Sequence, residues 1–362
     1  MDTASKQPEL CEVRTFSYKQ IDGCSIQLDV YPPEHGRPLK PVPAVVFFHG
    51  GGLSVGTRTS WFPDWLKNRV TAAGMTFMSA DYRLIPPSTS HDIVEDIQAL
   101  FRFLSTDLNA LLLQNNSQQP FQVDIDALAV AGASAGGLCA YLAVMHAHPK
   151  PKALLALYAM GGDFMIPHYF SPKTEVFFRG REVLDPNDFQ EYLHPRSTRL
   201  QPISQSMLAY HGPDYRIPGY PANPRLLLPR LYLQLGTWLD YYTGQHEPSL
   251  SAQLRGAQTG ADLTSLLLDE HRALFPQLYV DMTWPPAFLV HGNKDSAVPV
   301  VESQNMERLL KSAGVKVTLK VVDGQEHSFD KAEGAEETFG GLGGLFDEII
   351  TFLAESLRVS NV

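Results

Sequence analysis

A serine between two glycines carries the strongest chemical signal in the sequence. Gly132, Ser134 and Gly136 form a G-x-S-x-G motif between a predicted strand, residues 127–133, and a predicted helix, residues 136–146. At such a sharp turn the serine takes strained backbone angles, and a Cβ two positions away on either side would collide with the chain. The turn exposes the hydroxyl and directs the helix N-terminus at it, which favours negative charge there. The motif therefore predicts a nucleophilic serine.

A serine hydroxyl needs a base, and the base must be oriented by a third group. Asp295 follows the predicted strand 286–291, and His327 follows the predicted strand 315–322. Both loops leave the carboxyl ends of strands, where α/β sheets collect catalytic groups. One helix and one strand separate the two residues, as neighbouring loops require. We therefore predict that Ser134, Asp295 and His327 form a catalytic triad.

Three consecutive glycines, Gly50, Gly51 and Gly52, follow the predicted strand 42–48. Such a run costs backbone entropy and is tolerated where the chain takes unusual angles or approaches another group closely. We expect the N–H groups of Gly51 and Gly52, together with that of Ala135, to form an oxyanion hole, and a Cβ at position 51 or 52 to block that approach. Loss of one such donor costs about 3 kcal/mol in the transition state.

Other titratable groups lie near these motifs and have simpler explanations. Asp323 and Glu326 share a loop with His327, and we expect both to be solvated. We expect His291 to be a packed histidine at a strand end. His49 opens the glycine loop, and we expect it to hold the loop's shape by hydrogen bonding rather than to exchange protons. No cluster of His, Cys and carboxylates has the spacing of a metal site, so we expect neither a metal nor another cofactor.

Alternating strand-like and helix-like segments must position these residues. This alternation predicts an α/β fold with a mostly parallel sheet and helices on both faces. The predicted strands are residues 24–31, 42–48, 75–81, 127–133, 154–160, 286–291 and 315–322, and the predicted helices are 61–73, 90–113, 136–146, 302–313 and 345–357.

Residues 161–284 break this alternation. The segment is rich in Pro, Tyr, Leu and His, with helical pieces at 226–242 and 262–275 and no clear strand. We expect a helical cap or lid, inserted between two core strands, whose aromatic residues mostly pack together while one or two line the pocket. For Trp61 and Trp65, just after the glycine loop, packing and a place in the pocket wall are both open.

Composition limits the classes of partner. The chain has 362 residues, 44% of them hydrophobic, and a net charge of −10 without a basic stripe, which argues against nucleic acid and anionic membranes. Its cysteines, Cys11, Cys24 and Cys139, are widely spaced and odd in number, which predicts reduced thiols. We see neither a signal peptide nor an apolar run long enough to span a bilayer, so we expect an intracellular, cytoplasmic protein.

With these motifs the chain resembles the hormone-sensitive-lipase-like carboxylesterases of the α/β-hydrolase fold. The general character of the sequence is also similar to that of fungal members of this family in natural-product pathways. The resemblance covers residues 25–160 and 285–357. The matching pieces are HGGG at 49–52, DYRL at 81–84 with Pro86, Asp96, GASAGG at 132–137, Asp295, and HSF at 327–329.

The resemblance implies hydrolysis of a small-molecule ester or lactone through an acyl-serine, without a metal. It implies a core of residues 23–160 and 285–362, and a cap built from an N-terminal segment, residues 1–22, and the insertion 161–284. Family members often form homodimers through the last strand and helix, and the oligomeric state of this chain stays open.

Two other functions remain compatible with the sequence. A pathway enzyme of the same fold could use Ser134 for acyl transfer, lactonisation, elimination or condensation, since these differ from hydrolysis in which nucleophile reaches the acyl-enzyme. A non-catalytic small-molecule receptor on the same scaffold is less compatible, because such receptors typically lose the histidine that His327 supplies here.

Overall fold

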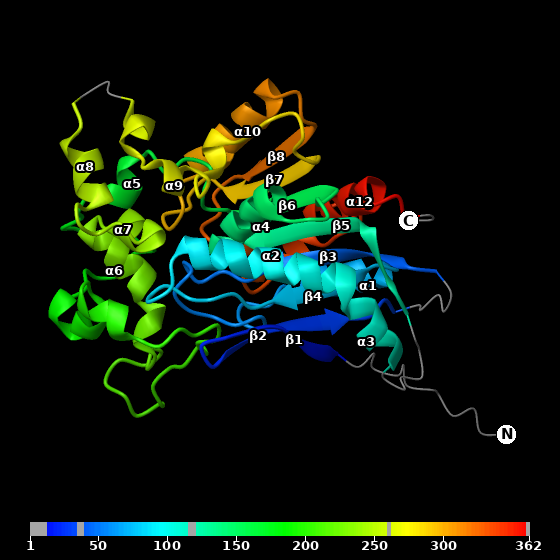
Figure 1. Cartoon of the computed structure of the whole chain (residues 1–362), viewed down its shortest axis with the longest axis horizontal. Helices are drawn as coiled ribbons and strands as arrows, with labels where there is room; N and C mark the ends of the chain where they lie inside the picture. Colours follow the sequence, from blue (N-terminus) through cyan, green and yellow to red (C-terminus); the bar gives the residue numbers. More distant parts are fainter. Residues whose placement is uncertain (1–12, 35–39, 115–120, 259–261, 360–362) are drawn as a thin grey trace.

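An eight-stranded sheet forms the centre of the described chain (Figure 1). The computed structural model describes residues 13–34, 40–114, 121–258 and 262–359. The strand order is β1-β2-β4-β3-β5-β6-β7-β8, and neighbours from β4 to β8 are parallel. This arrangement confirms the predicted α/β fold class. The strands are β1 Arg14–Ile21, β2 Cys24–Tyr31, β3 Val42–Phe48, β4 Thr76–Ala80, β5 Val123–Ala133, β6 Ala153–Leu157, β7 Ala287–Gly292 and β8 Val317–Val322.

Helices cover both faces of this sheet. Successive side chains of a strand point to opposite faces, so Val46 of β3 joins one apolar core and Phe47 joins the other. A strand buried on both faces reads as a continuous apolar run, as VVFF does here. One face carries α2 Ser90–Thr106, α3 Leu108–Gln114, α4 Ala135–His146 and α10 Val301–Ser312, and the other carries α1 Asp64–Ala72, α11 Ala335–Phe339 and α12 Leu345–Ser356.

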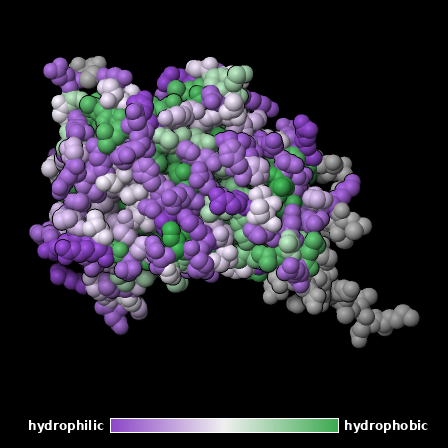
Figure 2. Space-filling view, in the orientation of Figure 1, coloured by the Kyte–Doolittle hydropathy of each residue, from purple (hydrophilic) through white to green (hydrophobic). Residues whose placement is uncertain are grey.

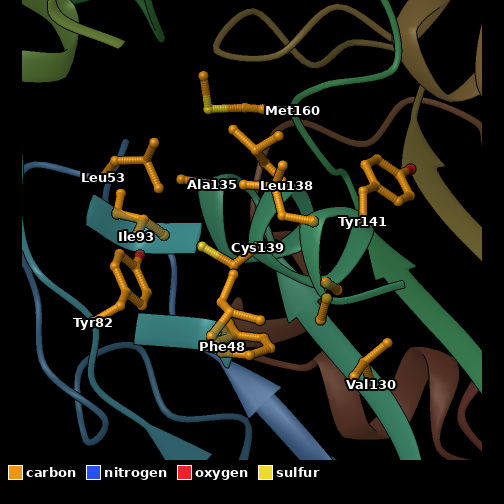
Figure 3. Packing of buried hydrophobic residues seen from close by; sticks show 14 of the residues in the cluster. Phe48, Leu53, Tyr82, Ile93, Val130, Ala135, Leu138, Cys139, Tyr141 and Met160 are labelled. Carbon is orange, nitrogen blue, oxygen red and sulfur yellow. The ribbon is translucent and has the colours of Figure 1, made fainter. Parts of the chain in front are cut away.

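The core beneath α4 is closely packed. In Figure 3, Cys139 of α4 lies among Phe48, Tyr82 and Ile93, all of which are buried. Burial raises the pKa of the Cys139 thiol. Cys24 is also a buried free thiol, whereas Cys11 lies outside the described residues.

A helical segment separates β6 from β7. In Figure 1 it forms a lobe at the left, beyond one end of the sheet, and its described part adds no strand to that sheet. The elements lie within the predicted cap, residues 161–284. They are α5 Pro167–Phe170, α6 Leu228–Leu235, α7 Trp238–Thr243, α8 Leu250–Gly256 and α9 Asp269–Arg272, with 3-10 turns η1 Pro186–Tyr192, η2 Arg196–Arg199, η3 Pro224–Leu226, η4 Leu263–Leu266 and η5 Pro276–Leu278.

The predicted long helices are broken into shorter ones. The prediction of one helix over 226–242 is wrong, because Gly236 takes a left-handed φ of 62° and ends α6. A Cβ on Gly236 would lie 2.6 Å from the backbone nitrogen of Pro172, so the break also lets two segments of the cap approach closely. The predicted helix 90–113 likewise divides into α2 and α3 at Asp107.

The first described strand overturns part of the predicted cap. Residues 14–21, predicted to belong to an N-terminal cap segment 1–22, instead form the edge strand β1 of the sheet. Asp22 and Gly23 both have positive φ, 48° and 77°, and close a two-residue hairpin into β2. Residues 1–12 lie outside the described residues.

The described surface and helices show few special features. Figure 2 shows a largely polar face on which apolar residues are scattered in small patches. No helix in the described ranges is long and apolar enough to cross a bilayer. Within those ranges no three His, Cys, Asp or Glu side chains gather as they would around a metal ion.

Candidate active site

Ser134 occupies the sharp turn between β5 and α4. Its φ is 57° and its ψ is −122°, a backbone conformation that residues other than glycine rarely adopt. A Cβ on Gly132 would lie 2.0 Å from the carbonyl oxygen of Gly136, and a Cβ on Gly136 would lie 2.0 Å from that of Phe48. Gly132 is therefore required for the tight turn at Ser134, and Gly136 for the close approach of the start of α4 to the end of β3.

The structure brings the three predicted triad residues together. Nε2 of His327 lies 2.9 Å from Oγ of Ser134, and Nδ1 lies 2.6 Å from Oδ2 of Asp295. When Nδ1–H donates to the carboxylate, the lone pair of Nε2 faces the serine hydroxyl. This tautomer can take the serine proton.

The Asp295 carboxylate is buried and fixed on both oxygens. Its Oδ1 accepts hydrogen bonds from the backbone N–H groups of Ala297 and Val298, at 2.9 and 2.8 Å. Burial alone would raise the pKa of Asp295, but hydrogen bonds and charge from His291 and His327 outweigh it and hold the pKa well below its ordinary range. Asp295 is therefore the ionised member of the triad.

His291 packs at the end of β7, as the sequence suggested. Its Nδ1 lies 2.7 Å from Oγ of Ser303, and its Nε2 lies 2.9 Å from the carbonyl oxygen of Val298. The same Nε2 is 3.3 Å from Oδ2 of Asp295. His291 and His327 thus both approach the same oxygen of the acid, Oδ2.

The prediction that Glu326 is merely solvated is wrong. Its carboxylate accepts hydrogen bonds from the backbone N–H and the hydroxyl of Ser296, and from the backbone N–H of His327. It therefore joins the loop that holds the acid to the loop that holds the histidine. Asp323, by contrast, is exposed and accepts a hydrogen bond from the side chain of Asn293.

The glycine loop presents unpaired backbone donors beside Ser134. Among the described residues, the N–H groups of Gly51, Gly52 and Ala135 donate to no protein acceptor. Gly51 and Gly52 have positive φ, 108° and 58°. The prediction that a Cβ here would block the approach of the oxyanion needs correction. A Cβ on Gly51 would first meet the carbonyl oxygen of Val55 in the same loop, at 2.0 Å, and a Cβ on Gly52 would first meet Pro229 of the insertion, at 2.4 Å.

His49 holds the shape of this loop. Its Nδ1 donates to the carbonyl oxygen of Gly50 at 2.7 Å, and its ring stacks on Tyr82 with centroids 4.4 Å apart. Burial lowers the pKa of His49 to about 4, so the ring is neutral. The Tyr82 hydroxyl donates to the His49 carbonyl oxygen and ties the loop to the segment after β4.

A buried network supports the triad histidine, and sequence reasoning missed it. Tyr158 follows β6 with a φ of 38°, and its ring packs edge-on against His327 at 4.7 Å. Its hydroxyl donates to Asp330, whose other oxygen accepts from Nε1 of Trp65. In the sequence, only the position of Tyr158 pointed to this role, because Tyr158 directly follows β6 just as Ser134 directly follows β5.

A cavity of about 410 Å³ opens in front of Ser134, between the sheet and the insertion. Trp61 lines it, whereas Trp65 stacks on Phe346 at 3.9 Å. From the insertion, Tyr210 and Trp238 reach the wall. As expected for most aromatic residues of the insertion, four of its tyrosines are not in the cavity wall: Tyr215, Tyr232, Tyr241 and Tyr242.

Comparison with known proteins shows what this geometry is similar to. A model described as "alpha/beta hydrolase fold" matches residues 45–210, which include the glycine loop and the serine turn. The match and the sheet described above show that the chain has the α/β-hydrolase fold. This match and the relatives below confirm the resemblance to the hormone-sensitive-lipase-like carboxylesterases.

Fungal proteins with two kinds of name are similar to the chain in sequence. It is 25% identical to the "Probable carboxylesterase M8" of Phoma sp. over 324 residues, 87% of this chain and 88% of that protein. It is 28% identical to the "Non-reducing polyketide synthase ausA" of Aspergillus calidoustus, over 90% of this chain but 13% of the synthase. The resemblance to fungal natural-product proteins is thereby confirmed.

Solved structures agree on the fold. A thermophilic esterase, Est2 of Thermogutta terrifontis, superposes with a TM-score of 0.53 at 18% identity, covering 99% of this chain and 95% of the esterase. The solved structures thus show the fold, and the likeness to a carboxylesterase rests on the sequence of the Phoma relative.

Proposed function

We propose that this α/β-hydrolase is a serine carboxylic-ester hydrolase that acts through an acyl-serine on a small or medium ester or lactone. The observation that carries the proposal is the hydrogen-bonded chain from Ser134 through His327 to Asp295, which lies beside free backbone N–H groups at a cavity. Nucleophile, base, orienting acid and oxyanion donors are the parts that acyl transfer needs.

In the proposed reaction, Oγ of Ser134 attacks the ester carbonyl while Nε2 of His327 takes the serine proton. Asp295 keeps His327 in the required tautomer and stabilises the imidazolium that forms. The N–H groups of Gly51, Gly52 and Ala135 bind the oxyanion. The carbon–oxygen bond to the alcohol then breaks, His327 protonates the leaving oxygen, and water hydrolyses the acyl-serine.

The carboxylesterase relative and the esterase fold support hydrolysis, and a substrate series tests it. We expect the wild-type protein to hydrolyse p-nitrophenyl esters, with a maximum at short or medium acyl chains because the cavity is small. Ser134→Ala should lower kcat/KM by at least about 10⁴-fold, because it removes the nucleophile and leaves the neighbouring backbone unchanged. Circular dichroism of the variant controls for folding, and turnover retained by a folded Ser134→Ala protein would contradict the proposal.

The polyketide synthase relatives favour a second candidate, transfer of the acyl group to a nucleophile other than water. Such synthases match nine-tenths of this chain, so the same site could serve acyl transfer, lactonisation or condensation in a natural-product pathway. Mass analysis of the products formed in water with added alcohols or amines distinguishes the two. Hydrolysis gives the free acid throughout, whereas transfer gives the new ester or amide as the main product.

A further inference from the structure

We propose that the substrate carries a carboxylate besides its ester group, and that Arg230 binds this carboxylate in the cavity. The inference rests on the proposed function, since it names the class of ester. It gives a role to a buried cation that the proposed reaction does not use.

Arg230 is a buried guanidinium with almost no protein partner. It lies on α6 in the cavity wall, and only 5% of the residue is exposed. Its Nε is buried and has no hydrogen-bond partner in the described structure. The nearest carboxylate, that of Glu182, is 3.8 Å from Nη2, and the Glu182 side chain is 69% exposed. Burial lowers the pKa of Arg230, yet a guanidinium remains charged in proteins.

Arg225, five residues earlier, shows how this chain satisfies a buried arginine when the role is structural. Arg225 is equally buried, with 6% exposed, but its guanidinium donates to the carbonyl oxygens of Ser54, Ile85 and Pro86. Burying a charge without such partners is costly. The contrast indicates that Arg230 obtains its partner from a bound molecule.

The other charged groups of the cavity wall reinforce this assignment. Arg179, Arg181 and Lys331 also line the cavity, and Glu182 is the one carboxylate among the described lining residues. The whole chain has a net charge of −10, so an excess of cations here does not follow from composition. A carboxylate matches the planar fork of a guanidinium and accepts two parallel hydrogen bonds from it.

Matched pairs of esters test the proposal with the charge on either side of the scissile bond. On the acyl side, the mono-p-nitrophenyl ester of terephthalic acid is compared with p-nitrophenyl 4-carbamoylbenzoate, in which a neutral amide replaces the free carboxylate. On the alcohol side, p-acetoxybenzoate is compared with p-acetoxybenzamide. We expect kcat/KM to be about 10- to 100-fold higher for the anionic member of at least one pair, as a buried charge-assisted hydrogen bond provides.

Variants assign this preference to Arg230. Arg230→Gln should reduce the anionic-to-neutral ratio of kcat/KM about tenfold or more, and Arg230→Lys should retain part of it. Arg199→Gln removes a cation from an exposed position of the insertion outside the cavity wall, and should leave the ratio at its wild-type value. A ratio near one for both pairs, or the same ratio in Arg230→Gln, would overturn the proposal.

Binding to Ser134→Ala separates this proposal from the proposed hydrolysis. This variant cannot form an acyl-serine, so calorimetric titration with the same esters measures recognition without turnover. Tighter binding of the anionic member supports the Arg230 assignment even if the wild-type protein hydrolyses neither ester. Equal binding of both members contradicts the assignment even if hydrolysis is established, and needs no folded Arg230 variant.

Discussion

The ends of the parallel strands and the helical insertion face the same cavity but hold their functional groups differently. At the strand ends, Asp295 and His327 each have protein partners at hydrogen-bonding distance. In the insertion, Arg230 lies in the cavity wall, and its buried Nε has no hydrogen-bond partner among the described residues. If the two proposals hold, the strand ends are pre-organised by protein contacts, whereas the insertion contributes a group that a bound substrate completes.

After Ser134→Ala, the largest effect on activity is expected at the strand ends, in Asp295→Asn. The amide keeps the size of the side chain but removes the charge that orients His327. We expect kcat/KM to fall by roughly 10³- to 10⁴-fold, with a smaller change in KM. Steady-state kinetics on a p-nitrophenyl ester check this, and near-UV circular dichroism shows whether the fold is kept. A loss below tenfold would mean that the strand ends are not the pre-organised part of the site.

An intermediate effect is expected where the two regions touch, in Gly52→Ala. The new Cβ would lie 2.4 Å from Cβ of Pro229 on α6, at a residue whose φ is already 58°. We expect kcat to fall about 100-fold, because the shift misplaces an oxyanion donor.

A double mutant sharpens the Gly52 result. Pro229→Gly removes the Cβ that the new methyl group meets, so the double variant should recover about tenfold of the lost kcat. Full additivity of the two single effects would show that the insertion does not constrain the glycine loop.

The smallest effect, a pH-dependent change in the free energy of unfolding, is expected at the base of the insertion, in Glu302→Gln. Glu302 of α10 is fully buried and accepts hydrogen bonds from the N–H groups of Gly161 and Gly162 and from the Tyr169 hydroxyl. Burial raises the pKa of Glu302 to about 8, although these hydrogen bonds act in the opposite direction.

The sign of the pH effect follows from this raised pKa. The protonated acid stabilises the fold fully below about pH 4.5, the ordinary value, and that contribution is lost as pH rises through about 8. Between pH 6 and 8 the wild-type protein should lose about 2 kcal/mol more than Glu302→Gln, a few degrees in Tm. Thermal unfolding of both proteins over this pH range measures the difference. If the Tm values of the two proteins changed in parallel with pH, Glu302 would already be ionised in the native state.

The sequence predicted the strand ends well because their signals are local. The sharp turn at Ser134 has a glycine two residues away on each side, and those glycines are visible in the sequence. The chain order of serine, acid and histidine likewise follows the order of the strands. At the strand ends, the residue types and their spacing therefore already predict the backbone geometry.

The sequence predicted the insertion poorly because its contacts are long-range. The backbone of Pro172 approaches too closely for a Cβ at Gly236, where α6 ends, and this contact is not visible in the sequence. The missing partner of Arg230 Nε is likewise visible only when the surroundings of Arg230 are known. The edge strand β1 was missed for a related reason. Its residues are mostly half-buried or exposed, so the apolar alternation that marks a strand is weak.

Covalent labelling of the wild-type protein with an organophosphonate tests the central claim most directly, that Ser134 is an activated nucleophile. Intact-protein mass spectrometry followed by peptide mapping should find one adduct, on Ser134, that is absent in Ser134→Ala and forms far more slowly in Asp295→Asn. A folded wild-type protein that stays unlabelled at Ser134, or that is labelled on another residue, would contradict the account and favour a non-catalytic receptor on this fold.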